Sequence, residues 1–178
     1  VPMKGFDILI SASKLLKDQG VDHRITIIGE GPQEGALRDQ ANKLGVGECI
    51  EFKGYRTPAE VRTALYSASI FVMPSLWDGE KGTQDGIPVA LMESMACGTL
   101  AISSRLSGIP ELIEDGVSGL LTEPGDSHAL AEAIHAALSM NEFEHQGMTA
   151  CAREAVENQH DIQKLTQELL NDMQKIIQ

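Results

Sequence analysis

The sequence predicts an α/β protein with a doubly wound parallel sheet, and three observations support this fold class. Short runs rich in β-branched residues alternate with longer amphipathic segments along the first 140 residues, as in parallel sheets covered by helices on both faces. After residue 140 the pattern is helical only, which predicts two additional helices at the C-terminal end. The chain has 178 residues, of which 42% are hydrophobic, and this is enough for one full hydrophobic core.

Segments rich in branched aliphatic residues predict the strands, and they are residues 25–28, 50–52, 70–73, 100–103 and 119–122. Helices are predicted near residues 4–19, 33–44, 58–67, 88–97, 109–114, 126–139, 142–157 and 160–177. No linker-like or low-complexity segment interrupts this order, so residues 1–178 are interpreted as a single domain.

The charge of the chain restricts the classes of partner. There are 26 acidic residues against 14 lysines and arginines, which gives a net charge of −12. A surface of that sign repels nucleic acid and anionic lipid, so we expect no nucleic-acid partner. An anionic ligand can bind only where backbone amides and local cations overcome the overall field. Lys81 and Arg56 are weak candidates for such cations, because a charged loop residue is by default solvated.

Cysteine usage and hydropathy indicate the compartment. The three cysteines, Cys49, Cys97 and Cys151, are odd in number and far apart in the sequence. This favours reduced thiols and a cytoplasmic setting over a disulfide framework or a zinc site. No apolar run approaches the roughly 20 residues that span a bilayer, and the N-terminus lacks the apolar region of a signal peptide.

The most informative stretch is residues 84–98, QDGIPVALMESMACG. It is interpreted as a glycine-containing loop that enters a helix, with Asp85 in the loop and Glu93 in the helix. Pro88 suits the first helical position, where its missing N–H costs no hydrogen bond. Gly98 suits the end of the helix.

Glu93 is the awkward residue of this helix. At about 3.6 residues per turn its face is small and apolar, since it is shared with Val89, Ala90, Ala96 and Cys97. We therefore predict a buried carboxylate, which needs hydrogen-bond donors. A structural role, as a loop cap or as the partner of a buried Lys or Arg, and a ligand-binding role have about equal weight. In the second role Glu93 accepts from vicinal hydroxyls while the loop N–H groups bind an anion, which describes a site for ribose and phosphate.

A second Gly-Ile-Pro at residues 108–110 repeats the first, at residues 86–88. Both follow a predicted strand and precede a predicted helix, so both should lie on the sheet edge where ligands of open α/β sheets bind. For the second copy, a plain helix start is the favoured interpretation.

Together these residues resemble a known family, the retaining glycosyltransferases of the GT-B fold and of the group 1 (family 4) type. Asp85, Glu93 and the Ser94-Met95-Ala96-Cys97-Gly98 that follows are similar to its Glu-x7-Glu segment. Further markers occur in the family's order at residues 4–7, 29–32, 52–55, 74–75, 107–113 and 115–121. The resemblance covers nearly the whole chain. The long loop of residues 77–86 resembles members that build exopolysaccharides and lipopolysaccharides.

The resemblance implies that the chain is the Rossmann-like, nucleotide-sugar-binding C-terminal half of such an enzyme. Glu93 would accept from the ribose hydroxyls, and Asp85 would be catalytic, contacting the donor sugar or stabilising charge at its anomeric carbon. The diphosphate would be bound by Lys4 and by the N–H groups of Gly86, Ile87 and Val89. The base would lie near Gly54, Tyr55 and Arg56. The chain resembles the family in lacking a metal-ligand cluster, so we expect no metal and no cofactor. The expected substrate is a nucleotide-diphosphate sugar.

The chain departs from the family at three points. Asp85 replaces the usual Glu and is one methylene shorter, and Pro88 stands where many members have Gly, which removes one backbone donor. The sequence also opens almost at Lys4, so the first strand and the N-terminal acceptor domain of the family are expected to be missing. Because the first strand of such a sheet is central, we predict a gap or strain at the sheet centre. Transfer by these residues alone is not expected, and any membrane contact would involve the missing half.

Other classes of function stay open at this point. A non-catalytic nucleotide-binding module would share the loop and the helix, and a sugar-nucleotide epimerase of the same fold is the nearest enzymatic alternative. A phospho-receiver or flavodoxin-like domain would need an acidic cluster after its first strand or a flavin-phosphate loop, and the sequence shows neither.

Overall fold

The structure, a computed structural model, describes residues 2–77 and 86–159. Its strands are β1 (Ile25–Ile27), β2 (Ile50–Phe52), β3 (Ile70–Met73), β4 (Leu100–Ser104) and β5 (Leu120–Thr122). Every strand pairing is parallel, and the strands form one sheet of order β1-β2 and another of order β3-β4-β5. The predicted α/β class and the position of each predicted strand are confirmed.

The helices also follow the prediction, with local differences. They are η1 (Pro2–Lys4), α1 (Phe6–Asp18), α2 (Glu34–Lys43), η2 (Gly47–Cys49), α3 (Pro58–Ser67), α4 (Val89–Ala96), α5 (Ile109–Leu112), α6 (Ser127–Leu138) and α7 (Glu142–Gln159). The predicted helix over 4–19 is interrupted at Gly5, which has a φ of 62°, a value that glycine adopts without strain. The helix predicted over 160–177 lies outside the described residues.

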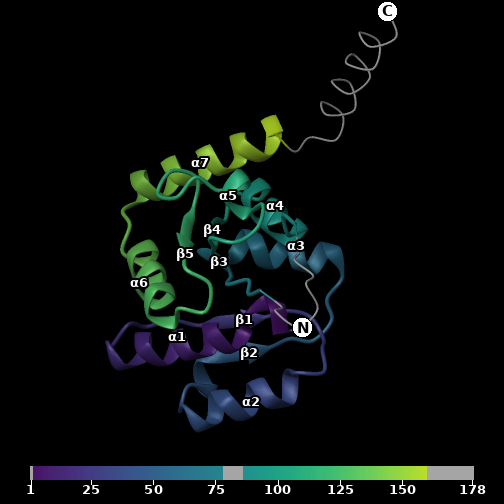
Figure 1. Ribbon diagram of the computed structural model, residues 1–178, viewed down its shortest axis with the longest axis vertical. Coiled ribbons are helices and arrows are strands. Elements are labelled where there is room, and N and C mark those ends of the chain that lie inside the picture. Colours follow the sequence, from purple (N-terminus) through teal and green to yellow (C-terminus); the bar gives the residue numbers. More distant parts are fainter. Residues whose placement is uncertain (1, 78–85, 160–178) are drawn as a thin grey trace, which may run out of the picture.

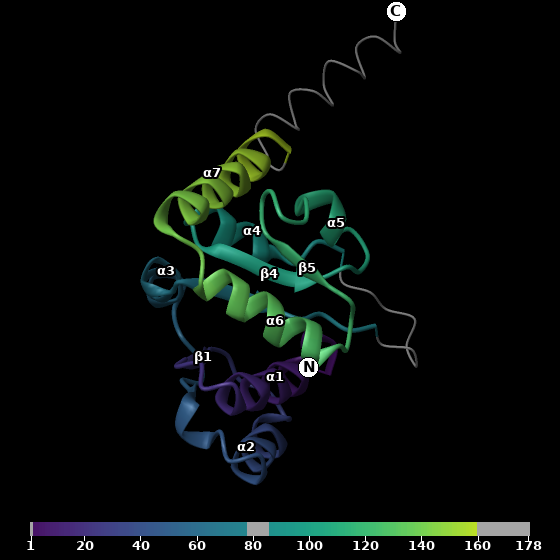
Figure 2. The same cartoon turned by 90° about the vertical axis from the view of Figure 1, so that its left-hand side faces the viewer.

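Helices cover both faces of the strands (Figures 1 and 2). On one face α1 and α6 pack on β4 through a cluster that includes Leu9, Leu16, Leu100, Ile102 and Leu130. On the other face α4, α5 and α7 form a second cluster around Leu91, Met95, Ala101, Leu112 and Ala152. All five residues of β4 are buried, so this strand is the centre of the core. The doubly wound arrangement predicted from the sequence is confirmed.

The two sheets are divided between β1 and β3, which are not hydrogen-bonded to each other. This is the place where the sequence predicts a gap. Helix α1 lies over both sides of the division (Figure 1), because its Ile10 packs with Ile27 of β1 in a third cluster while its Leu9 and Leu16 join the cluster of β4.

The segment between α5 and β5 has a structural role. The carboxylate of Asp115 accepts from the Leu121 N–H at 2.9 Å and from the Arg105 guanidinium at 2.8 Å. A Cβ atom on Gly119 would lie 2.7 Å from the carbonyl oxygen of Ala101, so only glycine lets the two backbones approach this closely. The residues 115–121 that resemble a family marker therefore fix β5 beside β4.

Two further findings concern the cysteines and the character of the helices. Cys49, Cys97 and Cys151 are all unpaired, as predicted. Within residues 2–77 and 86–159, none of the helices combines the length and the apolar character needed to cross a bilayer.

Candidate functional site

The candidate site lies at the carboxyl edge of the strands. The loops that leave this edge are residues 28–33 after β1, 53–57 after β2, 74–77 after β3 and 105–108 after β4. Ligands of open parallel sheets bind at this edge, because the loops there face helix N-termini and their unpaired N–H groups.

Lys4 is held at the end of β3. The N–H of Leu76 donates to the carbonyl oxygen of Met3 at 2.8 Å. A Cβ atom on Gly5 would lie 1.9 Å from the carbonyl oxygen of Pro74, so this turn requires glycine. Lys4 is half-buried there, one residue before the N-cap of α1, which no side chain caps.

At the start of α4, two N–H groups have no acceptor among the described residues. Pro88 is the N-cap, with φ −64° and ψ 126°, and it provides no side-chain cap. The prediction that Pro88 occupies the first helical position is wrong by one residue, since the helix begins at Val89. The first turn contains no acidic residue, and the N–H groups of Val89 and Ala90 find no acceptor among the described residues. Such a terminus attracts an anion.

Glu93 is exposed, so the prediction that its carboxylate is buried is wrong. The buried face of α4 is formed by Leu91, Ser94 and Met95. The small residues around Glu93 face solvent instead, and Val89 is 63% exposed. Small side chains expose little apolar area, so the larger Leu91 and Met95 decide which face is buried. The carboxylate of Glu93 has no hydrogen-bond or ion-pair partner within residues 2–77 and 86–159.

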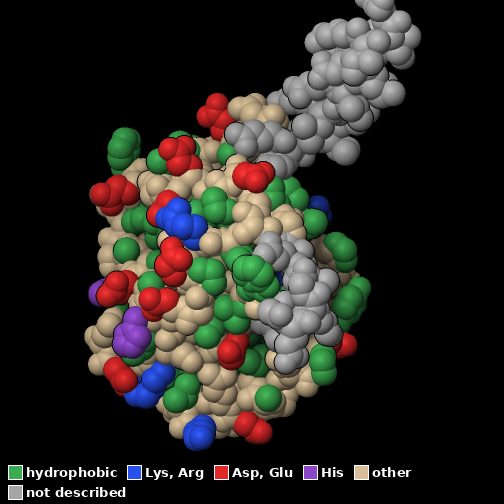
Figure 3. All heavy atoms as spheres, viewed as in Figure 1, with side chains coloured by type: hydrophobic (Ala, Val, Ile, Leu, Met, Phe, Trp, Pro, Cys, Tyr) green, Lys and Arg blue, Asp and Glu red, His purple; other side chains and the backbone are tan. Residues whose placement is uncertain are grey.

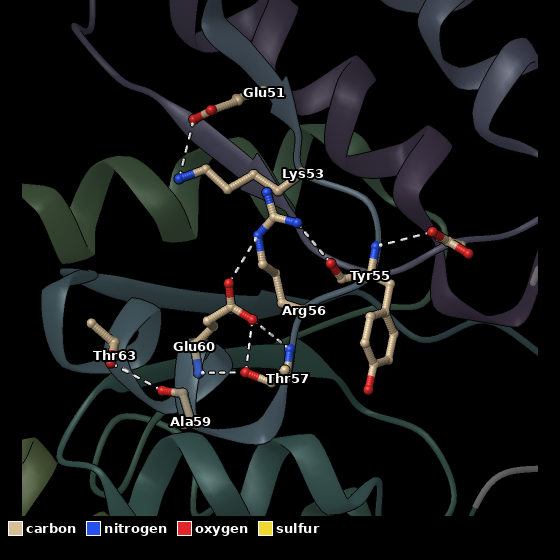
Figure 4. Close-up of polar contacts among 9 residues, drawn as sticks. Glu51, Lys53, Tyr55, Arg56, Thr57, Ala59, Glu60 and Thr63 are labelled. Carbon is tan, nitrogen blue, oxygen red and sulfur yellow. Dashed lines mark hydrogen bonds and ion pairs between the residues drawn. The ribbon is translucent and has the colours of Figure 1, made fainter.

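The loop predicted to lie near the base follows β2 (Figure 4). The N–H of Tyr55 donates weakly to Glu30 Oε1 at 3.4 Å, while the Tyr55 ring is 67% exposed and points away from the polar groups. The Arg56 guanidinium donates to the Tyr55 carbonyl oxygen at 2.7 Å and lies 3.9 Å from the Glu60 carboxylate. Arg56 is therefore engaged locally, whereas the phenol ring of Tyr55 is exposed.

The loop is braced by the start of α3. Thr57 and Glu60 form a capping box, in which Glu60 Oε2 accepts from the Thr57 N–H at 2.8 Å and from its hydroxyl at 2.7 Å. These hydrogen bonds hold the pKa of Glu60 below its ordinary value of 4.5, the hydroxyl contributing most. The N–H of Gly29 donates to the Gly54 carbonyl oxygen at 2.9 Å, so the β1 loop supports the β2 loop.

The structure brings some of the predicted site residues together. A Cβ atom on Gly108 would lie 3.0 Å from Cγ1 of Ile87, so the two Gly-Ile-Pro junctions pack against each other, as predicted for one edge. A small cavity of about 10 Å³ is enclosed by Met3, Ser75, Leu76, Leu106 and Ile109. Met3, the neighbour of Lys4 in the sequence, and Ile87 therefore both lie beside the residues that follow β4. Gly54, Tyr55 and Arg56 lie on the β2 side of the division.

Glu30, whose carboxylate lies against the Tyr55 loop, was not singled out from the sequence, although it lies in the Gly-Glu-Gly-Pro at residues 29–32. Asp85 and Lys81 lie outside the described residues. Within the described part of the chain, no group of three or more His, Cys, Asp or Glu side chains is placed to hold a metal ion.

The face shown in Figure 3 has acidic side chains spread over it and fewer basic ones, in agreement with the net charge of −12. Arg105, near the edge, is paired with Asp115 and Glu123.

Comparison with known proteins places these features in a family. The model of the family described as "Glycosyl transferases group 1" matches residues 1–153. The amylovoran biosynthesis glycosyltransferase AmsK of Erwinia amylovora is 41% identical over 170 residues, which are 94% of this chain and 41% of that protein. WcaL of Escherichia coli, assigned to colanic acid biosynthesis, is 38% identical over 97% of this chain and 42% of its own length. The chain thus spans about four tenths of the length of these relatives.

Solved structures show the same fold. Anabaena HepE in complex with UDP has a TM-score of 0.84 at 22% identity, over 98% of this chain and 46% of HepE. The C-terminal domain of the group 1 protein LpcC from Francisella tularensis has a TM-score of 0.75 at 21% identity, over 91% of this chain and 82% of that domain. The likeness to GT-B structures confirms the predicted fold.

Proposed function

The chain belongs to the group 1 glycosyl transferases, and from this premise we propose that it is the nucleotide-sugar-binding domain of a retaining glycosyltransferase for polysaccharide or glycoconjugate synthesis. One observation carries the proposal. Among the described residues, two N–H groups at the start of α4 have no acceptor, and the helix has no side-chain cap or acid in its first turn. One turn further, the exposed carboxylate of Glu93 has no hydrogen-bond or ion-pair partner within residues 2–77 and 86–159.

In this proposal the start of α4 binds the diphosphate. The N–H groups of Gly86, Ile87 and Val89 donate to it, and Lys4 supplies a positive charge in a chain whose net charge is −12. The same groups stabilise the diphosphate as it leaves during transfer, because the charge on the leaving oxygen grows in the transition state. We propose that a metal ion is not required.

Glu93 accepts from the ribose 2′- and 3′-hydroxyls in this proposal. An exposed carboxylate among small side chains leaves room for a sugar ring, and paired hydroxyls give it two charge-assisted hydrogen bonds. The Tyr55 ring lies on the other side of the divided edge, where it and the backbone of Gly54 and Arg56 are suited to a base. Asp85 is proposed as the catalytic carboxylate that contacts the donor sugar.

The substrate class is supported by the relatives. AmsK and WcaL are named for exopolysaccharide biosynthesis, and HepE was solved with UDP and with UDP-glucose. We propose a nucleotide-diphosphate sugar as the donor and a growing glycan as the acceptor. The acceptor site is assigned to a further domain, because this chain spans about four tenths of its relatives. Its location is proposed to be cytoplasmic, with any membrane contact made by that further domain.

Calorimetric titration with UDP, GDP and ADP tests the binding function. We expect one diphosphate to bind, and Glu93→Gln to weaken it by about tenfold or more, as for a hydrogen bond to a charged group. The matched control is Glu132→Gln, which changes an equally exposed acid on α6. Equal affinity in wild type and Glu93→Gln would remove the ribose role, and no binding of any diphosphate would overturn the proposal as a whole.

Experiments on the longer protein distinguish the proposed function from two alternative functions. If the chain is a non-catalytic nucleotide-binding module, Asp85→Ala in the longer protein leaves transfer intact. If it is a sugar-nucleotide epimerase, the donor sugar is converted without an acceptor. We expect neither result. Product analysis with and without acceptor distinguishes all three.

A further inference from the structure

The loop after β4 contains an unusual backbone conformation. Ser107 has a φ of 53°, and every other described residue with a positive φ is a glycine. L-amino acids other than glycine rarely adopt this region, because the Cβ atom comes too close to the backbone. Such strain persists only where the surrounding structure imposes it, and it is frequent at ligand-binding sites. The serine at this position therefore needs a physical reason.

Ser107 occupies the first central position of a tight turn. The N–H of Ile109 donates to the Leu106 carbonyl oxygen at 3.1 Å, which closes a four-residue turn. Gly108, the second central residue, has φ −76° and ψ −2°. A positive φ followed by these values is typical of a type II′ turn, which favours glycine at its first central position. The glycine of this turn stands one position later, so the strain falls on the serine.

Packing explains the glycine of this turn but not the serine. A Cβ atom on Gly108 would lie 3.0 Å from Cγ1 of Ile87 and 3.9 Å from the carbonyl carbon of Gly86. Glycine at position 108 therefore lets the turn lie close to the loop that precedes α4. Glycine at position 107 as well would remove the strain and keep this contact, so packing alone does not require Ser107.

Ser107 lies between the two parts of the proposed diphosphate site. The residue after it packs on Ile87, and the residue before it, Leu106, encloses the small cavity with Met3, the neighbour of Lys4. Ser107 itself is exposed, and its hydroxyl has no hydrogen-bond partner among the described residues. A polar group that is held under strain and has no partner among these residues is available to a ligand.

From these contacts we propose that the Ser107 hydroxyl donates a hydrogen bond to a phosphate oxygen of the donor diphosphate. The proposal rests on the function proposed above and adds one residue that contributes to donor affinity. A hydrogen bond to an ionised phosphate is charge-assisted, which makes it stronger than a neutral one. Glycine at this position would remove both the strain and the donor, whereas serine retains both.

A pair of substitutions separates the hydroxyl from the strain. Ser107→Gly removes both, so it should stabilise the fold by about fivefold in the unfolding equilibrium constant. Ser107→Ala removes the hydroxyl and keeps the strain, so its stability should stay close to that of the wild type. Both should weaken binding of the diphosphate that the wild type binds by about tenfold. The control is Ser139→Ala, which removes an exposed hydroxyl at the C-cap of α6 and should not change affinity. Urea unfolding and calorimetric titration measure the two quantities.

A second pair tests whether the side chain lies beside the phosphates. Asn and Asp both tolerate a positive φ. The amide of Ser107→Asn can donate to a phosphate, whereas the carboxylate of Ser107→Asp repels it, so the Asp variant should bind at least about tenfold more weakly than the Asn variant.

The outcomes separate this inference from the proposed function. Wild-type affinity in Ser107→Gly and Ser107→Ala, or equal affinity of the Asn and Asp variants, would overturn the inference and leave the proposed function standing. A loss confined to Ser107→Gly would also overturn it, because the effect would then come from the freedom of the glycine backbone. Absence of diphosphate binding by the wild-type chain would overturn both.

Discussion

The same tripeptide, Gly-Ile-Pro, begins two helices on the same edge of the molecule, and the helices begin at different points within it. At residues 86–88 the proline is the N-cap and α4 starts after it. At residues 108–110 the glycine is the N-cap, and Pro110 lies inside the first turn of α5. The tripeptide therefore signals a helix start without fixing which N–H groups stay unpaired.

The two helix starts therefore differ in which of their N–H groups have acceptors. At the second junction the Ile109 N–H donates to Leu106, the Glu111 N–H donates to Gly108, and Pro110 has no N–H. The first turn of α5 also holds its own acid, Glu111, whereas that of α4 holds none. The second junction is satisfied within the protein, as its plain helix-start interpretation implies, whereas at the first the N–H groups of Val89 and Ala90 have no acceptor among the described residues. Helices α3 and α6 resemble α5 in this respect. Thr57 and Glu60 cap α3, and Asp126 caps α6.

The largest expected effect is a loss of stability at the turn of Gly5, which lies against Pro74 after β3. Gly5→Ala should destabilise the chain by about 3 kcal/mol or more, because its Cβ would lie 1.9 Å from the Pro74 carbonyl oxygen. The control is Gly20→Ala, which has a φ of +76° but nothing within 4 Å and should cost about 1 kcal/mol. Urea unfolding measures both. Equal losses would show that the contact between Gly5 and Pro74 does not matter.

The next effect is on ligand affinity. Val89→Glu places a carboxylate in the first turn of α4, where none is present. Because the carboxylate competes with the diphosphate for the same N–H groups, we expect a roughly tenfold loss of affinity with unchanged or slightly increased stability. Glu111→Ala removes the acid of the second junction and should leave affinity unchanged. Titration with the diphosphate that binds the wild type measures both, and a loss in Glu111→Ala would contradict the distinction between the junctions.

A smaller effect is expected for a helix that caps itself. Asp126→Ala removes the side chain that accepts from the N–H groups of His128 and Ala129, each at 2.9 Å. We expect a loss of about 1 kcal/mol in unfolding free energy and no change in nucleotide affinity. Asp126→Asn, which keeps the acceptor, should recover most of the stability. A variant that binds nucleotide more weakly would show that α6 contributes to the site.

The fold could be predicted from the sequence because alternation of strands and helices is a local pattern that burial reinforces. The site was predicted less completely. The binding roles of the first-junction residues stay a prediction, and Glu93 was expected to be buried, since small apolar neighbours were taken as core residues. Leu91 and Met95, with more area to bury, turn α4 the other way. Glu30 was missed because its contact with Tyr55 joins two loops that are distant in the sequence, and no local periodicity encodes such a pairing.

The smallest expected effect is a pH dependence at the capping box of α3. Hydrogen bonds from Thr57 lower the pKa of Glu60 from 4.5. A carboxyl whose pKa is lower in the folded state stabilises the fold fully above the pKa of the unfolded chain, and this contribution is lost as the pH falls through the folded value. Glu60→Gln keeps the hydrogen bonds but cannot titrate. The stability difference between wild type and Glu60→Gln should therefore stay constant from neutral pH to about 4.5 and shrink below it, as urea unfolding at a series of pH values would measure. A difference that is constant through the acid range would mean that the Glu60 carboxylate is not hydrogen-bonded to Thr57 in solution, and that α3 keeps only the cap that the Thr57 hydroxyl gives to the Glu60 N–H.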